Sequence, residues 1–183
     1  MKSSVILLLV ALLAIPDIAS SEIYKLAVPG EKAMEFYWWP VLGQVPGWSH
    51  DEEASRANSA NILVPKGSSF SSAPAVIYGK AMFKPRIPNT KSLGQLIADD
   101  RKAFEHDFPG VAISELAAVS DGDGKKLRYF SYTPSGAGSW ELVAYGEEGE
   151  FYLIFTVSGN SKAALIHAKP VFESVIAAYR EGP

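Results

Sequence analysis

The sequence predicts a mixed α+β domain, an antiparallel sheet of about six strands with helices on both faces, as in an α/β/α sandwich. Two observations carry this prediction. Four apolar segments between residues 111 and 157 are joined by short, glycine-rich connections, and connections this short allow only antiparallel neighbours. Two stretches with helical spacing of apolar residues, 92–108 and 161–179, stand before and after these segments.

The N-terminal part of the chain is predicted to add the first strands. The runs 23–28, 34–39 and 75–83 are rich in aliphatic and aromatic residues. Gly79, inside the third run, indicates a β-bulge or a point where another part of the chain comes close. The polar run 51–57 is predicted to form one or two helical turns.

Ser92 begins the clearest helix of the sequence. Ser92 and Gln95 have the spacing of a capping box, and Pro109-Gly110 ends the helix. The apolar residues recur at helical intervals, which places them on one buried face. That face is predicted to contain Leu93, Leu96, Ile97, Phe104 and Phe108.

The strands after this helix are followed by a closing helix. The last strand contains FYLIFTV, which is almost wholly apolar and therefore predicts a central strand buried on both faces. Pro170 interrupts the closing helix and predicts a kink or a fresh start there. The four strands are expected at 111–119, 125–133, 139–145 and 150–157.

The first residues have the composition of an export signal. Lys2 precedes an unbroken apolar run at 5–15, and small residues at 19–21 meet the needs of a signal peptidase. The apolar run is shorter than the roughly 20 residues of a membrane-spanning helix. We expect residues 1–21 to be a cleaved signal peptide and residues 22–183 to be one globular domain, in the bacterial periplasm or secreted.

Composition excludes several kinds of site. The sequence contains no cysteine, which excludes disulfides, thiolate zinc sites and a cysteine nucleophile. Its formal net charge is −3, and without a basic cluster a nucleic acid is not expected as a partner. Stable membrane insertion is not expected after signal cleavage. No cofactor and no metal site are predicted.

Several segments resemble the Mog/PsbP-like fold superfamily. They are ILVPKG, PAVIYGKAMF, the helix at 92–108, WELVAYGEEGEFYLIFTVSG and FESVIAAY, which together span about residues 62–179. The resemblance implies an exported PsbP-like bacterial domain. Members of this superfamily are similar in being non-enzymatic accessory or binding proteins, so the resemblance implies such a role at the level of the fold.

The densest group of polar residues is His50, Asp51, Glu52 and Glu53, of which His50, Asp51 and Glu52 are the candidate site residues. A histidine beside carboxylates can act as a general base or help to ligate a hard metal ion. This alternative predicts a hydrolase or metal-dependent enzyme, with His167 or Glu141 as a distant partner. The other interpretation is a solvated loop that leads into a helix, because acidic residues are favoured near helix N-termini.

Aromatic residues crowd into residues 36–48, which include Tyr37, Trp38, Trp39 and Trp48. Side chains alternate along a strand, so these rings are either covered on both faces or partly left exposed. Left exposed, they form a candidate binding surface for an envelope protein, a peptide or a glycan, because Trp and Tyr are frequent interface anchors. The preferred prediction is thus an exported, soluble, non-enzymatic binding or accessory domain.

Overall fold

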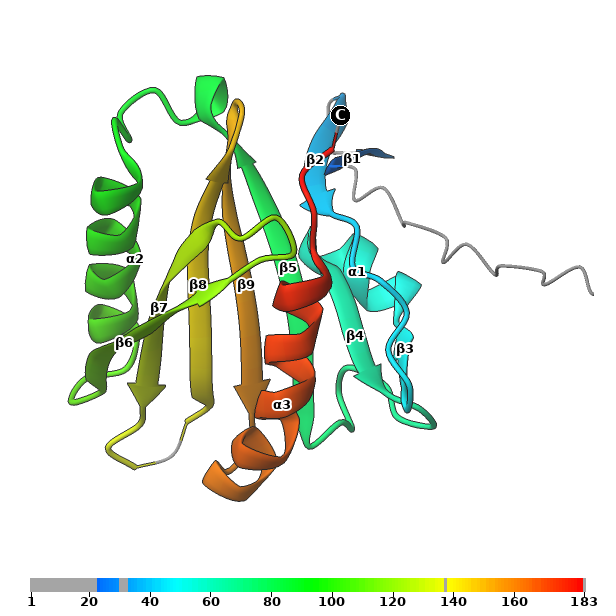
Figure 1. Cartoon of the computed structure of the whole chain (residues 1–183), viewed down its shortest axis with the longest axis vertical. Helices are drawn as coiled ribbons and strands as arrows, with labels where there is room; N and C mark the ends of the chain where they lie inside the picture. Colours follow the sequence, from blue (N-terminus) through cyan, green and yellow to red (C-terminus); the bar gives the residue numbers. More distant parts are fainter. Residues whose placement is uncertain (1–22, 30–32, 137, 183) are drawn as a thin grey trace, which may run out of the picture.

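The computed structural model describes residues 23–29, 33–136 and 138–182 (Figure 1). The predicted signal peptide, residues 1–21, lies outside them. In the described part, nine strands form one antiparallel sheet, accompanied by three α-helices and a short 3-10 helix. The chain is therefore of mixed α+β class, as the sequence predicts.

The elements are as follows. The strands are β1 (Ile23–Pro29), β2 (Met34–Pro40), β3 (Trp48–His50), β4 (Asn61–Pro65), β5 (Ala75–Phe83), β6 (Ala112–Ser120), β7 (Lys126–Thr133), β8 (Trp140–Glu148) and β9 (Phe151–Gly159). The helices are α1 (Glu52–Asn58), α2 (Leu93–Asp107), α3 (Lys162–Ala178) and the 3-10 helix η1 (Lys84–Arg86).

The sheet has more strands than the sequence predicts because β3 and β4 are not visible as period-two patterns. β3 has three residues and β4 has five. They become strands through pairing with each other, with Trp48 opposite Pro65, and through pairing of β4 with β5, with Leu63 opposite Ile77. These are long-range contacts that no local pattern encodes.

The strand order is β1-β2-β5-β9-β8-β7-β6, with β4 also paired to β5 and β3 to β4. β9 pairs with β5 on one side and β8 on the other, and most of its residues are buried. The central position predicted for FYLIFTV is therefore confirmed, whereas burial on both faces is incomplete, because Ile154 is half-buried and borders a cavity. Only two residues, Gly149 and Glu150, separate β8 from β9, and Gly149 has a positive φ of 49° that suits glycine.

The outer edge of β5 is shared between two partners. Asn61 to Leu63 of β4 pair with residues 77–79 at its middle, and in the described residues β2 pairs with it at Trp38 opposite Ala81. Gly79 lies opposite Asn61, and a Cβ added to it would be 2.7 Å from the Cγ atom of Pro40. Gly79 is therefore a point of close approach by the end of β2, one of the two predicted alternatives.

α2 begins as its cap predicts. The Ser92 Oγ accepts a hydrogen bond from the Gln95 backbone N–H at 3.2 Å, and Leu96 and Ile97 are buried. Phe108 is an exception, because it is the C-cap residue and its side chain is 41% exposed. Its ring stacks on Phe104 at 4.7 Å between centroids instead of entering the core.

α3 runs without a break through Pro170, so the predicted fresh start does not occur. Pro170 is exposed, and Ile166, whose carbonyl would have accepted its missing N–H, is also exposed. The opposite side of the helix holds both halves in place, because Ala168 and Phe172 are almost completely buried.

Two buried clusters take alternate residues of the sheet. Leu142 and Ala144 of β8 belong to a cluster that we call the α3 cluster, while Val143 and Tyr145 belong to one that we call the α2 cluster. The α3 cluster consists of Leu42, Leu63, Ala75, Ile77, Ala81, Leu127, Tyr129, Leu142, Ala144, Leu153, Phe155, Val157, Leu165, Ala168, Phe172, Val175, Ile176 and Tyr179. The α2 cluster consists of Ile97, Phe130, Tyr132, Val143 and Tyr145.

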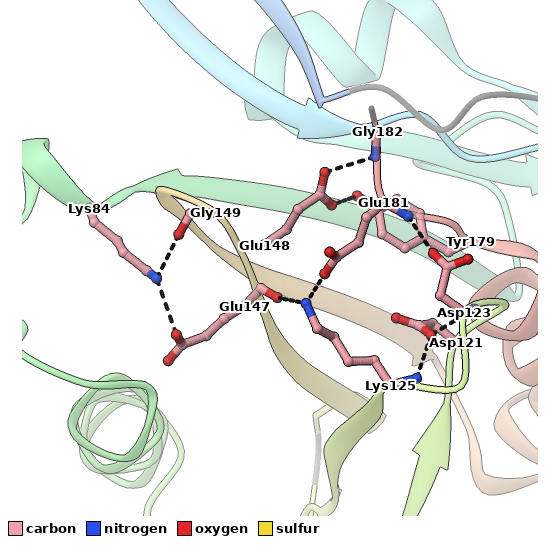
Figure 2. A network of polar contacts seen from close by, with 10 residues as sticks. All are labelled: Lys84, Asp121, Asp123, Lys125, Glu147, Glu148, Gly149, Tyr179, Glu181 and Gly182. Atoms are coloured by element: carbon pink, nitrogen blue, oxygen red, sulfur yellow. Dashed lines mark hydrogen bonds and ion pairs between the residues drawn. The ribbon is translucent and has the colours of Figure 1, made fainter.

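The residues after α3 are tied to two hairpin turns by a polar network, shown in Figure 2. The Glu181 backbone N–H donates to Asp123 Oδ2 at 2.8 Å, and the Gly182 N–H donates to Glu148 Oε1 at 3.1 Å. Lys125 forms an ion pair with Glu181. The C-terminal segment therefore joins the β6–β7 turn to the end of β8.

Candidate functional site

The four aromatic residues of the candidate surface lie in three different places. Trp39 is buried against the ring of Tyr24, with centroids 6.4 Å apart, and borders a cavity of about 370 Å³. Trp48 is half-buried in β3 and lines another cavity of about 530 Å³. Tyr37 and Trp38 line the third cavity, of about 580 Å³. These rings are close in the sequence, but the fold places them at three different cavities.

The polar cluster is used by the local structure around α1. Asp51 caps the helix: its Oδ1 accepts from the Ala54 N–H and its Oδ2 from the Phe70 N–H, both at 3.0 Å. His50 Nδ1 lies 2.9 Å from Asn61 Oδ1, which is an amide and not a carboxylate. Glu52 pairs with Arg56 on the exposed helix surface at 3.4 Å. These contacts match those of a capped helix start.

In the part of the chain that the structure describes, His50 forms no hydrogen bond or ion pair with either of the distant partners considered above. His167 is exposed on α3, and Glu141 lies in β8, where it accepts a hydrogen bond from Ser158. Within residues 23–29, 33–136 and 138–182, no group of three or more His, Cys, Asp or Glu side chains is placed to hold a metal ion. The same residues contain no helix long and apolar enough to cross a bilayer.

The cavity of about 580 Å³ is the best candidate site, and we call it the sheet cavity. Its floor is the sheet face that alternates with the α3 cluster: Tyr78 of β5 pairs with Thr156 of β9, which pairs with Val143 of β8. α2, β2 and η1 supply its walls. The lining residues are Phe36, Tyr37, Trp38, Ser59, Tyr78, Lys80, Ala81, Met82, Phe83, Arg86, Ile87, Asp100, Phe104, Tyr132, Glu141, Val143, Ile154 and Thr156.

Glu141 provides a carboxyl group to this cavity. It is half-buried, and the Ser158 hydroxyl donates to its Oε1 at 2.8 Å. Burial raises the pKa of Glu141 above its ordinary value, and the nearby Asp100 carboxylate raises it further, whereas the Ser158 bond opposes the shift. The site thus favours the neutral form of Glu141 more than water does.

Asp100 enters the cavity from α2 and is held by a chain of tyrosines. The Tyr145 hydroxyl donates to Asp100 Oδ2, and the Tyr132 and Tyr145 hydroxyls lie 2.8 Å apart. Burial raises the pKa of Tyr132 to about 12, and it raises the pKa of Tyr145 still further. Both tyrosines therefore stay neutral donors that fix the Asp100 carboxylate.

Two cations also line the cavity. Lys80 is half-buried on β5, and its Nζ lies 5.9 Å from the centroid of the Tyr78 ring. Arg86 of η1 donates from Nη1 to the Phe36 carbonyl at 2.6 Å, and its guanidinium lies 4.7 Å from the centroid of the Trp38 ring. Trp38 itself packs on Phe83, with centroids 5.0 Å apart.

Sequence reasoning did not single out Lys80, Arg86 or Asp100. A usable signal exists for Lys80, because it is a lone charge inside the otherwise uncharged strand AVIYGKAMF. Such a charge cannot be placed in a closed core without a partner, so it indicates that this part of the strand faces an opening. Asp100 carries no comparable signal, because it is one of several charges on α2.

Comparison with known proteins adds a fold likeness and no family. No family model matches the chain, and no curated protein matches it. Among solved structures it is similar to a protein of unknown function from Pseudomonas aeruginosa, described as a suggested regulator, with 13% identity and a TM-score of 0.50. The match covers 87% of this chain and 99% of that one. At this identity the likeness is one of fold alone.

Proposed function

We propose that this chain is an exported, non-enzymatic binding domain and that the sheet cavity is its binding site. The observation that carries the proposal is the cavity itself, about 580 Å³ in volume and lined by apolar and aromatic side chains with a few charged ones. Ligand sites in proteins have this size and this mixture, in which polar groups orient a ligand held by apolar contacts.

We also propose an α/β/α sandwich of Mog/PsbP-like type, with helices on both faces of the sheet. The alternation in β8 supports it, because Leu142 and Ala144 share a buried cluster with α3 whereas Val143 and Tyr145 share one with Ile97 of α2. Neighbouring residues of a strand point to opposite faces. An experimental structure that places α2 and α3 on one face would contradict this.

Export is supported by the apolar leader at 5–15 and the small residues at 19–21. The test is mass spectrometry of the protein isolated from its host. A mature N-terminus close to Ser21 or Glu22 in a periplasmic or culture fraction is expected. Intact Met1 on cytosolic protein would contradict export and leave the cavity proposal untouched.

The alternative of a hydrolase or metal-dependent enzyme gains no support from the contacts of its proposed residues. Asp51 is engaged as a helix cap, and His50 contacts an amide. The envelope protein, peptide or glycan partner that the aromatic segment predicts stays a prediction.

A small-molecule screen by NMR tests the binding site. Ligands should shift the amide signals of β5, β8 and β9 that border the cavity. Ile154 is half-buried on the cavity floor, so Ile154→Trp should fill the space and abolish these shifts. Ala163→Trp, on the exposed side of α3, is the matched control and should leave them intact. Ligand shifts that persist in Ile154→Trp would place binding elsewhere.

A further inference from the structure

We infer that the sheet cavity binds a small organic anion, a carboxylate or sulfonate with an apolar or aromatic body. The inference rests on the proposed binding function and adds the charge and chemical class of the ligand. It follows from which of the four charged groups in the cavity are already engaged by the protein.

Lys80 is the charged group of the cavity that forms no hydrogen bond or ion pair with the residues that the structure describes. It is half-buried, and its Nζ lies 5.9 Å from the centroid of the Tyr78 ring. The three N–H donors of its ammonium are therefore not used by these residues. A ligand carboxylate or sulfonate at Lys80 would accept a charge-assisted hydrogen bond from them.

Arg86 is a second cation, with its orientation already fixed. Its Nη1 is engaged by the Phe36 carbonyl at 2.6 Å, and the guanidinium plane rests near the Trp38 ring. A guanidinium has five N–H donors, and this one bond leaves most of them for a ligand. An anion meeting Arg86 would therefore not have to order a free side chain first.

The two acids of the cavity are engaged within the protein. Asp100 accepts the Tyr145 hydroxyl bond, and Glu141 accepts the Ser158 hydroxyl bond. Burial raises the pKa of Glu141 above its ordinary value, and the Ser158 bond opposes that shift. The two cations match the two acids in number, and the N–H donors of Lys80 and Arg86 are the groups of this set that are left to bind an anion.

The uncharged lining defines the rest of the ligand. Met82, Phe104, Val143 and Ile154 give the cavity apolar side chains from β5, α2, β8 and β9. Apolar surface of this kind is released from water when an aliphatic chain or aromatic ring covers it. A bare inorganic anion would leave this surface hydrated, so an organic body is part of the inference.

Two fluorescent probes distinguish the contribution of the ligand's aromatic body to affinity from the contribution of its negative charge. 8-Anilinonaphthalene-1-sulfonate and N-phenyl-1-naphthylamine share one aromatic frame, and only the first carries a sulfonate. The wild-type protein should bind both, with the sulfonate about tenfold tighter, since a charged hydrogen bond is worth about one decade in affinity. Lys80→Met should remove that preference and leave the affinity for the neutral probe unchanged.

Control variants exclude a general effect of charge or folding. Lys102→Met removes a cation from the exposed surface of α2 and should keep the preference, and Lys80→Arg should keep it as well. Arg86→Gln should reduce it by a smaller factor than Lys80→Met. Circular dichroism and the melting temperature show whether each variant is folded, and Ile154→Trp shows that the probes occupy the cavity.

The outcomes distinguish this inference from the proposed function. Equal wild-type affinities for the two probes, both lost in Ile154→Trp, would overturn the anion class and leave a binding cavity. A preference that survives Lys80→Met in a folded protein would also overturn it. Failure of the wild-type protein to bind either probe would contradict the binding function itself.

Discussion

The α3 cluster and the α2 cluster are built from alternate residues of the same strands, yet they differ in how many buried residues they contain. The α3 cluster joins eighteen buried residues from the sheet, α3 and the segment after β2, among the described residues. The α2 cluster joins five, and beside it the same face carries Lys80, Glu141 and a cavity of about 580 Å³. One side of the strands thus carries most of the buried core, and the other side carries the open sheet cavity.

The largest effect is expected in the α3 cluster. Phe172 is fully buried on α3, so Phe172→Ala should lower the free energy of unfolding by about 3–5 kcal/mol. Ile166→Ala, on the exposed side of the same helix, is the control and should change it by less than about 0.5 kcal/mol. Urea denaturation measures both. A small loss at Phe172 would mean that the α3 cluster is not the stabilising one.

In the α2 cluster the loss should be smaller. Ile97 is the residue of α2 that belongs to this cluster, and it is buried, so Ile97→Ala should cost about 2–3 kcal/mol. Phe104 is only half-buried, with its ring 4.7 Å from that of Tyr132, so Phe104→Ala should cost about 1–2 kcal/mol. The test is the order of the losses in free energy of unfolding, which should be largest for Phe172→Ala and smallest for Phe104→Ala. A loss at Phe104 as large as that at Phe172 would remove the contrast between the clusters.

Gly79→Ala tests the junction between β5 and the end of β2. The added methyl group would meet Pro40 Cγ at 2.7 Å, too close for a real contact, so Pro40 must shift. Overpacking of this kind should cost about 1–2 kcal/mol. Gly43→Ala, where an added Cβ meets nothing within 4 Å, is the control. Equal melting temperatures for the two variants would contradict the close approach.

The smallest effect should depend on pH. The pKa of Glu141 is raised in the folded state by burial, so its contribution to stability is complete below its ordinary pKa and is lost as pH rises through the folded value. Glu141→Gln keeps the neutral form at every pH. The free energy of unfolding of the variant should match that of the wild type near pH 4 and exceed it near pH 8. Urea denaturation at the two pH values measures this difference. A difference that is constant with pH would contradict this.

Elements with a local signal could be predicted from the sequence. The cap at Ser92, the aliphatic and aromatic run of β5 and the short turns between β6 and β9 each depend on neighbouring residues, and the structure contains all of them. β3 and β4 could not be predicted in the same way, because their pairing partners lie elsewhere in the chain. Pro170 misleads for a related reason: tertiary packing of Phe172 keeps the helix continuous.

The candidate site was harder to predict for a geometric reason. Tyr37 and Trp38 could be selected as residues of interest, but whether they meet Trp39 or Trp48 depends on how β2 leaves the sheet. The sheet cavity exists because α2 leaves part of the face of β5 and β9 uncovered. The lateral position of a helix over a sheet cannot be predicted from the periodicity of the helix. The sequence therefore could not predict that Lys80 and Asp100 line the same cavity.

The polar network of Figure 2 has a practical consequence for labelling the protein. A fluorophore or affinity tag joined after Gly182 would start beside the Glu148 carboxylate and next to the Lys125–Glu181 ion pair. Its attachment could therefore disturb the turns that this segment joins. A label on the outer surface of α2, at Lys102 for example, avoids that region.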